Sequence, residues 1–214
     1  MPSEPYMGKD ENSVHSPRLG FFGGTFDPPH NGHLKIAHTA IEKANLTKLF
    51  FCPAHHAPLR TEPALFSAHH RLGMVEAICK NHPVMEVYDA EIKHRCTRYS
   101  YETIAELKSQ FPDHKLFFIL GADQFARLSE WKGTEQLTQL VHFLVFEREK
   151  DHADTPPIKN LTMSLMKNPL INISSTEIRS LLHRDKLPDS QLPAEVVSYM
   201  LEQNLFPLNL SSPL

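Results

Sequence analysis

The residues best suited to chemistry lie in one stretch near the N-terminus, which has the sequence GGTFDPPHNGH from Gly23 to His33. Its glycines allow the backbone to turn sharply and to approach a ligand closely. The stretch leads into a predicted helix, whose first amides have no partners within the helix. His30 and His33 are three positions apart, so on a helix they share one face and can converge on one group. Together these features predict a phosphate site.

Other interpretations of this stretch are weaker. It contains neither the G-K-[ST] of a P-loop nor the G-x-G-x-x-G of a dinucleotide fingerprint. Two surface histidines beside a proline-rich turn are a structural alternative. A zinc pair is another, because histidines at this spacing can bind a metal, but no nearby Cys or Glu completes such a site.

A second stretch, from Ser174 to Arg179, has the sequence SSTEIR. Its S-x-x-E pattern is typical of a capping box at the start of a helix. Hydroxyl groups, helix N-terminal amides and an arginine one turn further on also suit a pyrophosphate. Taken alone, the stretch is better interpreted as an ordinary cap, but beside the first stretch the pyrophosphate interpretation is preferred.

Gly121-Ala122-Asp123 follows the strongest strand signal of the chain, Leu116 to Leu120. A carboxylate at a strand end lies where a ribose diol would bind, although Asp123 alone is equally a helix cap. Trp131 is the single tryptophan, and its indole can stack on a flat heterocycle or simply belong to the core. Arg71 belongs to a helix that could face the ligand. The pairs His55-His56 and His69-His70 receive no role.

The elements that must position these residues alternate between short apolar strands and helices. Strands are predicted at Leu19 to Phe22, Leu49 to Cys52, Val84 to Tyr88, Leu116 to Leu120, Val141 to Phe146 and Leu170 to Ile173. Helices are predicted from Leu34 to Asn45, from a Ser67 cap to Lys80, from Tyr101 to Lys108, near Gln124 to Leu128 and Glu135 to Leu140, after Ser174, and from Pro193. Asp89 to Arg98 is expected to be a loop or edge hairpin, and Arg148 to Asn168 a mobile or variable segment.

This alternation predicts an α/β fold with a doubly wound parallel sheet. In such a sheet, ligands bind beyond the carboxyl ends of the strands. The glycine-histidine stretch, Gly121 to Asp123 and the Ser174 cap all lie at that edge, which strengthens each of the three predictions.

The composition limits the remaining possibilities. A chain of 214 residues is expected to form one domain, here 18–207 after a flexible tail at 1–17. A formal net charge of -3 gives no reason to expect nucleic-acid binding. Three widely spaced cysteines favour a reducing compartment, and no apolar run suits a signal peptide or a membrane span. We therefore expect a cytoplasmic protein.

The motifs resemble those of the nucleotidyltransferase superfamily, namely its GTFDPxHxGH signature and, from Ile173 to Arg179, its ISSTxIR motif. Within it the chain is most similar to the bacterial nicotinate-nucleotide adenylyltransferases over roughly 18–206. The similarity extends to Ser67 through Met74, Tyr99-Ser100 with Thr103, Gly121 through Asp123 followed by Trp131, Leu192-Pro193, and Val196 through Phe206. The chain departs from the family pattern at Pro58-Leu59-Arg60, at Arg98-Tyr99-Ser100 and at Lys132.

The resemblance implies a Rossmann-like domain with a small helical C-terminal portion, which transfers the adenylyl group of ATP to nicotinate mononucleotide. The products would be nicotinate adenine dinucleotide (deamido-NAD) and pyrophosphate, in NAD biosynthesis. The acceptor phosphate is largely dianionic near neutral pH, because its second pKa is about 6. The reaction therefore needs no general base but does need positioning and charge neutralisation. Mg²⁺ would be carried mainly by the phosphates and water.

The resemblance also implies roles for individual residues. The catalytic residues would be His30, His33 and Arg179. The residues that bind ATP would be Gly23, Gly24, Thr25, Phe26, Arg60, Gly121, Asp123, Ile173, Ser174 and Ser175. The residues that bind the pyridine nucleotide would be Tyr99, Ser100, Thr103 and Trp131. No protein side chain is assigned to a metal.

Three alternatives stay open on the sequence. The first is a sister adenylyltransferase that acts on nicotinamide mononucleotide or phosphopantetheine. The second is a non-catalytic nucleotide-binding module with the same fold, and the third is a structural metal-binding protein that uses the many histidines. The expected partners are ATP and nicotinate mononucleotide, with neither nucleic acid nor membrane, and self-association into a homo-oligomer is left open.

Overall fold

The computed structural model describes residues 16–56, 62–94, 98–147, 155–167 and 173–207. Six parallel strands form one sheet in the order β3-β2-β1-β4-β5-β6. The strands are β1 (Arg18–Gly24), β2 (Lys48–Pro53), β3 (Met85–Val87), β4 (Lys115–Gly121), β5 (Val141–Glu147) and β6 (Met163–Lys167). This confirms the predicted doubly wound parallel sheet of Rossmann type.

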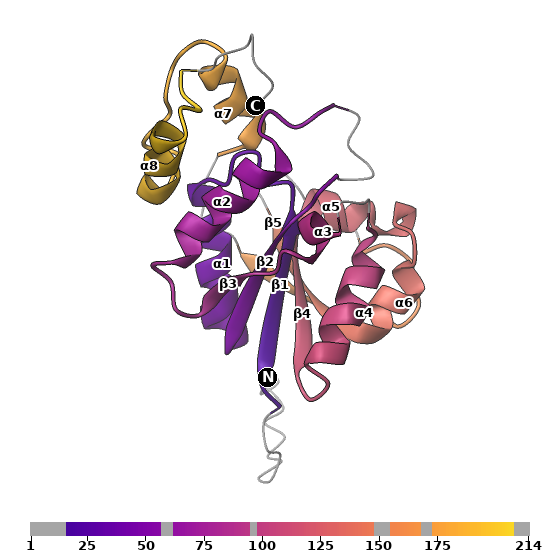
Figure 1. The fold of residues 1–214 in the computed structure, drawn as a ribbon. Helices are drawn as coiled ribbons and strands as arrows, with labels where there is room; N and C mark the ends of the chain where they lie inside the picture. The colour runs from indigo at the N-terminus through magenta and orange to yellow at the C-terminus, as the bar shows by residue number, and fades with distance from the viewer. Residues whose placement is uncertain (1–15, 57–61, 95–97, 148–154, 168–172, 208–214) are drawn as a thin grey trace, which may run out of the picture.

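Helices cover both faces of the sheet and extend beyond its upper end in Figure 1. They are α1 (Asn31–Ala44), α2 (Ala68–Cys79), α3 (Ala90–Lys93), α4 (Ser100–Gln110), α5 (Ala122–Ala126), the 3-10 helix η1 (Leu128–Glu130), α6 (Thr134–Leu140), α7 (Ser175–Leu182) and α8 (Ala194–Glu202). None of these described helices has both the length and the apolar character needed to cross a membrane.

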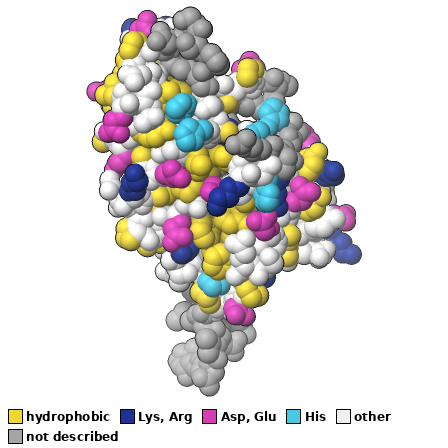
Figure 2. All heavy atoms as spheres, viewed as in Figure 1, with side chains coloured by type: hydrophobic (Ala, Val, Ile, Leu, Met, Phe, Trp, Pro, Cys, Tyr) yellow, Lys and Arg dark blue, Asp and Glu magenta, His cyan; other side chains and the backbone are white. Residues whose placement is uncertain are grey.

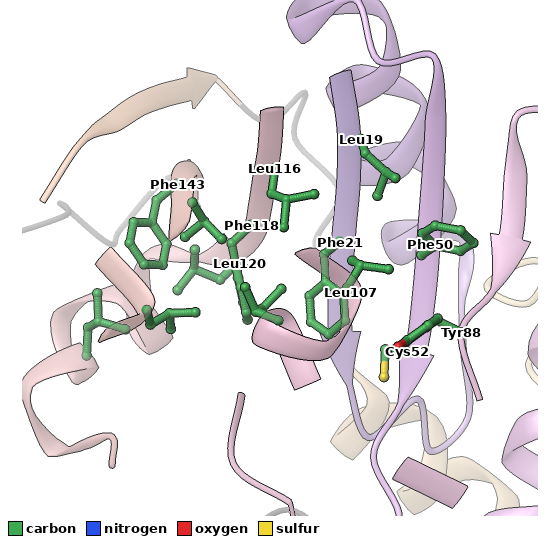
Figure 3. Close-up of a cluster of buried hydrophobic side chains, with 14 of the residues drawn as sticks. Leu19, Phe21, Phe50, Cys52, Tyr88, Leu107, Leu116, Phe118, Leu120 and Phe143 are labelled. Atoms are coloured by element: carbon green, nitrogen blue, oxygen red, sulfur yellow. The ribbon is translucent and has the colours of Figure 1, made fainter. Parts of the chain in front are cut away.

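The central strands are mostly apolar because both faces of the sheet are buried, and their charged residues lie at the strand ends. In β4, Leu116, Phe118 and Leu120 face a cluster that includes side chains of α4, α5 and α6, while Ile119 faces the cluster under α1 and α2. β5 alternates in the same way. Figure 3 shows part of the first cluster, with side chains from neighbouring strands pointing to the same side.

A third cluster of buried side chains joins the C-terminal helices to α2. Its members are Phe66, Met74, Ile78, Ile178, Leu182, Leu192, Val196, Met200 and Leu205. At this contact a Cβ atom on Gly73 would lie 2.3 Å from the hydroxyl oxygen of Tyr199, so only glycine lets α2 and α8 approach so closely. The small helical C-terminal portion is therefore packed on the sheet domain through α2.

The strand order reverses between β1 and β4, which are paired in the middle of the sheet. A reversal of this kind leaves a crevice beyond the carboxyl ends of the two strands, where ligands bind in open α/β sheets. The loops that follow Gly24 and Gly121 both begin at this crevice. In Figure 1 the carboxyl ends lie at the top, on the side of α7.

Three segments differ from the sequence predictions. The segment expected to be mobile or variable contains the strand β6, which was not predicted because this partly exposed edge strand lacks a continuous apolar run. The segment predicted as a loop contains the four-residue helix α3. Of the strand predicted at Leu170 to Ile173, residues 170–172 lie outside the described part of the chain, and Ile173 belongs to no strand.

The surface carries charges of both signs. On the face viewed in Figure 2, dark-blue basic and magenta acidic side chains are interspersed among hydrophobic ones. This distribution agrees with the nearly balanced composition of the chain, which has 22 Lys and Arg against 25 Asp and Glu.

Candidate active site

The loop after β1 has a fixed shape. Phe26 has a φ angle of 50°, in the left-handed region that costs a residue with a Cβ about 1–2 kcal/mol. Packing holds it there, because its ring lies edge-on to Phe22 and Phe51 at centroid distances of 5.5 Å. Gly24 leaves room for the ring, since a Cβ there would lie 3.1 Å from it. The predicted phosphate loop is thus anchored in the core through Phe26.

Asp27 organises this loop, a role that the sequence analysis missed. Its carboxylate is 1% exposed and accepts hydrogen bonds from the backbone amides of Leu65 and Phe66, both at 2.9 Å. Its backbone oxygen accepts a hydrogen bond from Arg179 Nη1 at 2.9 Å, and its Oδ2 lies 3.8 Å from the same nitrogen. The sequence signal for this role was an acidic residue between Phe26 and Pro28 in a loop.

His30 and His33 lie together, as predicted from their spacing. Their rings are stacked, with centroids 3.8 Å apart and planes 27° apart. The backbone N–H of His30 donates to His33 Nδ1 at 3.2 Å, so neutral His33 carries its proton on Nε2. Gly32 is needed here, because a Cβ would lie 2.9 Å from the His30 ring. His33 is therefore held in the tautomer and orientation of an Nε2–H donor.

The start of α1 is more occupied than the sequence predicted. The amide of Asn31 donates to the backbone oxygen of Gln191 at 2.9 Å, and its side-chain amide donates to the oxygen of Ser190 at 3.1 Å. The first amide of the helix is therefore not open to a ligand. This correction arises because the C-terminal portion folds back onto α1, a long-range contact with no local signal in the sequence.

The predicted pyrophosphate segment lies against the phosphate loop, although about 150 residues separate the two in sequence. Ser174 caps α7 by accepting a hydrogen bond from the amide of Glu177 at 3.2 Å, which confirms the predicted cap. Ser175 Oγ donates to the backbone oxygen of Pro28 at 3.3 Å. Arg179, besides its contacts with Asp27, donates from Nη2 to Thr176 Oγ1 at 3.1 Å.

Asp123 lies in the first turn of α5, directly after β4, and its side chain is exposed. A Cβ on Gly121 would lie 2.5 Å from Asp123 Oδ1, so glycine allows the carboxylate to lie back over the end of the strand. The structure thus places this carboxylate beside the crevice between β1 and β4. Its role toward a ribose stays a prediction.

The residues predicted to bind the pyridine nucleotide cluster around the start of α4, but they are not equivalent. Tyr99 is the N-cap residue of α4, with its amide donating to Glu102 Oε2 at 2.9 Å, and Ser100 follows, half-buried. Thr103, in contrast, is 0% exposed and donates to Glu91 Oε1 at 3.2 Å. It faces the core with Ile104, so direct contact with a ligand does not fit its position.

Glu91 is a buried carboxyl group that the sequence analysis placed in a loop. Burial raises its pKa to about 7, while the hydrogen bond from Thr103 and the charge of Arg98 act in the opposite direction. The neighbouring Cys52 thiol also has a raised pKa, chiefly because it is buried. Glu91 thus joins α3 to α4 and to the end of β2, directly behind the site.

Trp131 is half-buried and lies edge-on to Phe118 at a centroid distance of 5.9 Å, while its Nε1 is buried and makes no hydrogen bond within the described part of the chain. Next to it, Lys132 Nζ lies 4.5 Å from the centroid of the Tyr99 ring. Both Trp131 and Lys132 therefore belong to the same edge of the sheet as Tyr99.

Arg71 does not face the ligand edge as the sequence analysis suggested. It is 2% exposed and spreads its guanidinium group over four backbone oxygens, those of Thr25, Ala54, His55 and Phe66. These bonds tie the phosphate loop to the loop after β2 and to the start of α2. Arg71 is therefore a structural residue beneath the site.

Other residues singled out from the sequence bear on the site less directly. Arg60 lies outside the described residues, as do Pro58 and Leu59. His70 Nδ1 lies 3.3 Å from the hydroxyl of Tyr199, in the contact between α2 and α8. Among the described residues, no group of three or more His, Cys, Asp or Glu side chains is arranged to hold a metal ion.

The doubly wound sheet and the two loops that meet at its switch point define an α/β protein of the nucleotide-binding type. A sequence model described as cytidylyltransferase-like matches residues 21–181. The nicotinate-nucleotide adenylyltransferase of Bacillus subtilis (strain 168) is 31% identical over 189 residues, which cover 88% of this chain and 98% of that protein. The probable nicotinate-nucleotide adenylyltransferase of Shouchella clausii (strain KSM-K16) is 35% identical over 189 residues, or 88% and 96% of the two chains.

The chain therefore belongs to the cytidylyltransferase-like family, and within it to the nicotinate-nucleotide adenylyltransferases. Among solved structures, Plasmodium falciparum nicotinic acid mononucleotide adenylyltransferase complexed with NaAD superimposes with a TM-score of 0.74. It shares 22% sequence identity, and the match covers 91% of this chain and 99% of that one, which confirms the Rossmann-like fold. The family predicted from the motifs is confirmed.

Proposed function

We propose that the protein is a nicotinate-nucleotide adenylyltransferase, which transfers the adenylyl group of ATP to nicotinate mononucleotide in NAD biosynthesis. The products are nicotinate adenine dinucleotide and pyrophosphate. The Bacillus subtilis relative carries this activity in its name, and the match spans nearly the whole of that protein. We place the enzyme in the cytoplasm, in line with its cysteine usage, and treat residues 18–207 as its single domain.

The observation that carries the proposal is the contact between the two halves of the phosphate site. Arg179 reaches the backbone oxygen of Asp27 at 2.9 Å, and Ser175 reaches that of Pro28. Capping alone would require only the Ser174 hydroxyl, yet the segment also places Arg179 and the Ser175 hydroxyl against the glycine-histidine loop. Together they supply donors from both sides to a polyphosphate.

Each donor then has a distinct task in the reaction. His33 donates from Nε2–H to an oxygen of the α-phosphate, where charge develops as the acceptor phosphate attacks. His30 stacks on His33 and fixes its place, besides facing the phosphates itself. Arg179 neutralises the leaving pyrophosphate, and Ser174 and Ser175 bind the triphosphate beside it. Because the attacking phosphate is already anionic, these residues accelerate the reaction by positioning and electrostatic stabilisation alone.

Mg²⁺ bound with ATP would be held mainly by the phosphate oxygens and water rather than by protein side chains. The carboxylate at the phosphate loop, Asp27, accepts two backbone hydrogen bonds and faces Arg179, a donor set that orients an arginine rather than a metal. Such a metal would supply charge neutralisation on the phosphates. The protein's own part is to hold the imidazole and guanidinium groups around them.

The acceptor lies on the opposite side of the crevice, toward the start of α4. Tyr99, Ser100 and Trp131 approach it there, and Asp123 binds the ribose of the adenosine. Thr103 does not contact the acceptor; it supports the start of α4 through its hydrogen bond to Glu91.

Pyrophosphate release from ATP and Mg²⁺ tests this proposal when nicotinate mononucleotide, nicotinamide mononucleotide and phosphopantetheine are compared in parallel. We expect release with the first acceptor at the highest kcat/KM. A higher kcat/KM with either of the other two would assign the protein to a sister activity. No release with any of the three would identify a non-catalytic binding module.

A further inference from the structure

The side of the crevice opposite the phosphate loop is built from two segments that lock together. Gly133 has a φ angle of 73°, and a Cβ there would lie 2.2 Å from Tyr101 Cδ1. The Trp131-Lys132-Gly133 segment is thus pressed against the first turn of α4. Thr134 Oγ1 secures its other end by donating to the backbone oxygen of Trp131 at 2.7 Å. Residue 132 is therefore held at a defined place beside α4.

Lys132 is the cation of this locked segment. Its ammonium group lies 4.5 Å from the centroid of the Tyr99 ring, within the range of a cation–π interaction. Tyr99 in turn stacks on Tyr101 at a centroid distance of 6.4 Å. The charge is therefore positioned by an aromatic face rather than left on a freely moving side chain.

The two arginines that precede these segments, Arg98 and Arg127, each form an ion pair with a glutamate. Arg98 Nη1 lies 2.6 Å from Glu106 Oε2, and Arg127 Nη2 lies 2.7 Å from Glu130 Oε2. Lys132 forms no ion pair with any carboxylate in the described part of the chain. The one carboxylate in the first turn of α4, that of Glu102, accepts hydrogen bonds from the Tyr99 amide and the Tyr101 hydroxyl. Glu102 keeps its own negative charge, because both of its donors are neutral, and its oxygens are directed to α4 rather than to Lys132.

We propose that Lys132 is a specificity-determining residue for the acceptor: its ammonium group, placed over Tyr99 and without a carboxylate partner, favours a heterocycle that bears a carboxylate over one that bears a carboxamide. The inference rests on the proposed function, because it concerns the acceptor of that reaction. The two mononucleotides have similar shapes and differ by one charge, so a fixed cation discriminates between them where packing cannot.

The expected effect is modest because Lys132 is exposed and its charge stays hydrated. An exposed ion pair contributes little binding free energy. We therefore expect the charge to change the ratio of acid to amide affinity by about two- to fivefold. The same exposure makes the effect sensitive to salt, since ions screen surface charges beyond about 10 Å at 0.1 M. A purely structural role of Lys132 would not depend on salt in this way.

The test is the equilibrium binding of nicotinate and nicotinamide mononucleotides to the full chain, with Mg²⁺ and an unreactive ATP analogue present. We expect Lys132→Met to lower the ratio of acid to amide affinity by about two- to fivefold at low salt. Added salt should lower the ratio of the wild type toward that of the variant. Lys132→Arg, which retains the charge and stacks on aromatic rings, should keep the wild-type ratio.

Lys115→Met is the matched control, because it removes the same charge from an exposed residue at the opposite edge of the sheet. Its affinity ratio should equal that of the wild type. An unchanged ratio in Lys132→Met, an equal loss in the control, or absence of binding by both mononucleotides would overturn the inference. Because binding is measured without turnover, failure of the proposed reaction would appear separately, as an absence of pyrophosphate release.

Discussion

At the scale of single residues, the proposed reaction depends on imidazole groups that act as oriented donors. His33 is fixed from three directions: its Nδ1 accepts from the His30 amide, its face stacks on His30, and its edge meets Phe26 at a centroid distance of 5.0 Å. Such orientation matters because a preorganised donor requires no rearrangement as charge develops on the phosphate. The residue types and their spacing predict that His30 and His33 lie together, whereas the tautomer of His33 follows only from the structure.

His33→Ala removes that donor and should lower kcat by about 10²- to 10³-fold. The KM for ATP should change much less, because the lost interaction is strongest in the transition state. Steady-state kinetics give both constants, and thermal unfolding checks that the variant is folded. His38→Ala, an exposed histidine of the same helix, serves as the control. A folded His33→Ala enzyme with nearly wild-type kcat would refute the assigned role.

At the scale of elements, buried charged side chains hold the loops of the site to the sheet. Arg71 donates to four backbone oxygens in three different segments, and Asp27 accepts from two backbone amides. Neither role follows from local sequence, because the partners lie up to 46 residues away and are backbone atoms common to every sequence. Both residues lie in the motifs that resemble the family, but only the packing shows that Arg71 is a structural residue.

Arg71→Met should destabilise the fold by about 3 kcal/mol or more, because it leaves buried carbonyl groups without donors. Arg71→Lys should be intermediate, since an ammonium group cannot reach all the oxygens that the guanidinium fork bonds. Urea unfolding measures both changes. A normal free energy of unfolding combined with a raised KM for ATP would instead show that Arg71 contacts the nucleotide.

Glu91 makes the stability of the fold depend on pH. Its pKa is about 7 in the folded protein, above the ordinary value of 4.5, so the folded state binds the proton more tightly than the unfolded state. The resulting stabilisation is complete below pH 4.5 and is lost as the pH rises to about 7. His38, His70 and His142 have lowered pKa values, so they act in the opposite direction near pH 6.5.

Glu91→Gln isolates this contribution, because the amide retains an acceptor for Thr103 but does not titrate. The variant should gain stability relative to the wild type as the pH rises, by up to about 3 kcal/mol at pH 8. Free energies of unfolding measured from pH 5 to 8 give the difference. Parallel curves for the two proteins would mean that Glu91 ionises normally in the fold.

At the scale of the whole molecule, the C-terminal portion completes the site. It supplies Arg179 and Ser175 to the phosphate loop, and Gln191 closes the start of α1. Its attachment runs through the cluster on α2, where Gly73 admits the ring of Tyr199. Stability and activity should therefore be coupled through a contact that lies away from the chemistry.

Gly73→Ala places a methyl group against Tyr199 and should cost about 1–3 kcal/mol of stability. The same change in a Tyr199→Leu background should cost less, since the clashing ring atoms are gone. Thermal unfolding of the four proteins gives the coupling. An equal loss of stability in both backgrounds would show that the alanine methyl group and the Tyr199 ring do not clash in solution.

The fold could be predicted from the sequence because the central strands are buried on both faces and therefore contain continuous apolar runs, such as Leu116 to Leu120. It located the two segments that the structure brings together, the glycine-histidine loop and the Ser174 cap, because each has its own local signature; their role toward phosphate stays a prediction. The prediction failed where the determinant was a long-range contact or an edge strand. β6 has no apolar run, Thr103 is buried with its hydroxyl on Glu91, and the first amide of α1 is occupied by Gln191. In the sequence, Lys132 is only a departure from the family motif. The structure adds that its ammonium group lies over the Tyr99 ring.

The most direct test of the account is the fate of the α-phosphate of ATP. The full chain is incubated with Mg²⁺, nicotinate mononucleotide and ATP that is labelled in either the α- or the γ-phosphate, and the products are separated. Adenylyl transfer predicts that the α-label appears in the dinucleotide, while the γ-label appears only in pyrophosphate, in equal molar amount. A γ-label on the acceptor, or an α-label that remains in mononucleotides, would contradict the account.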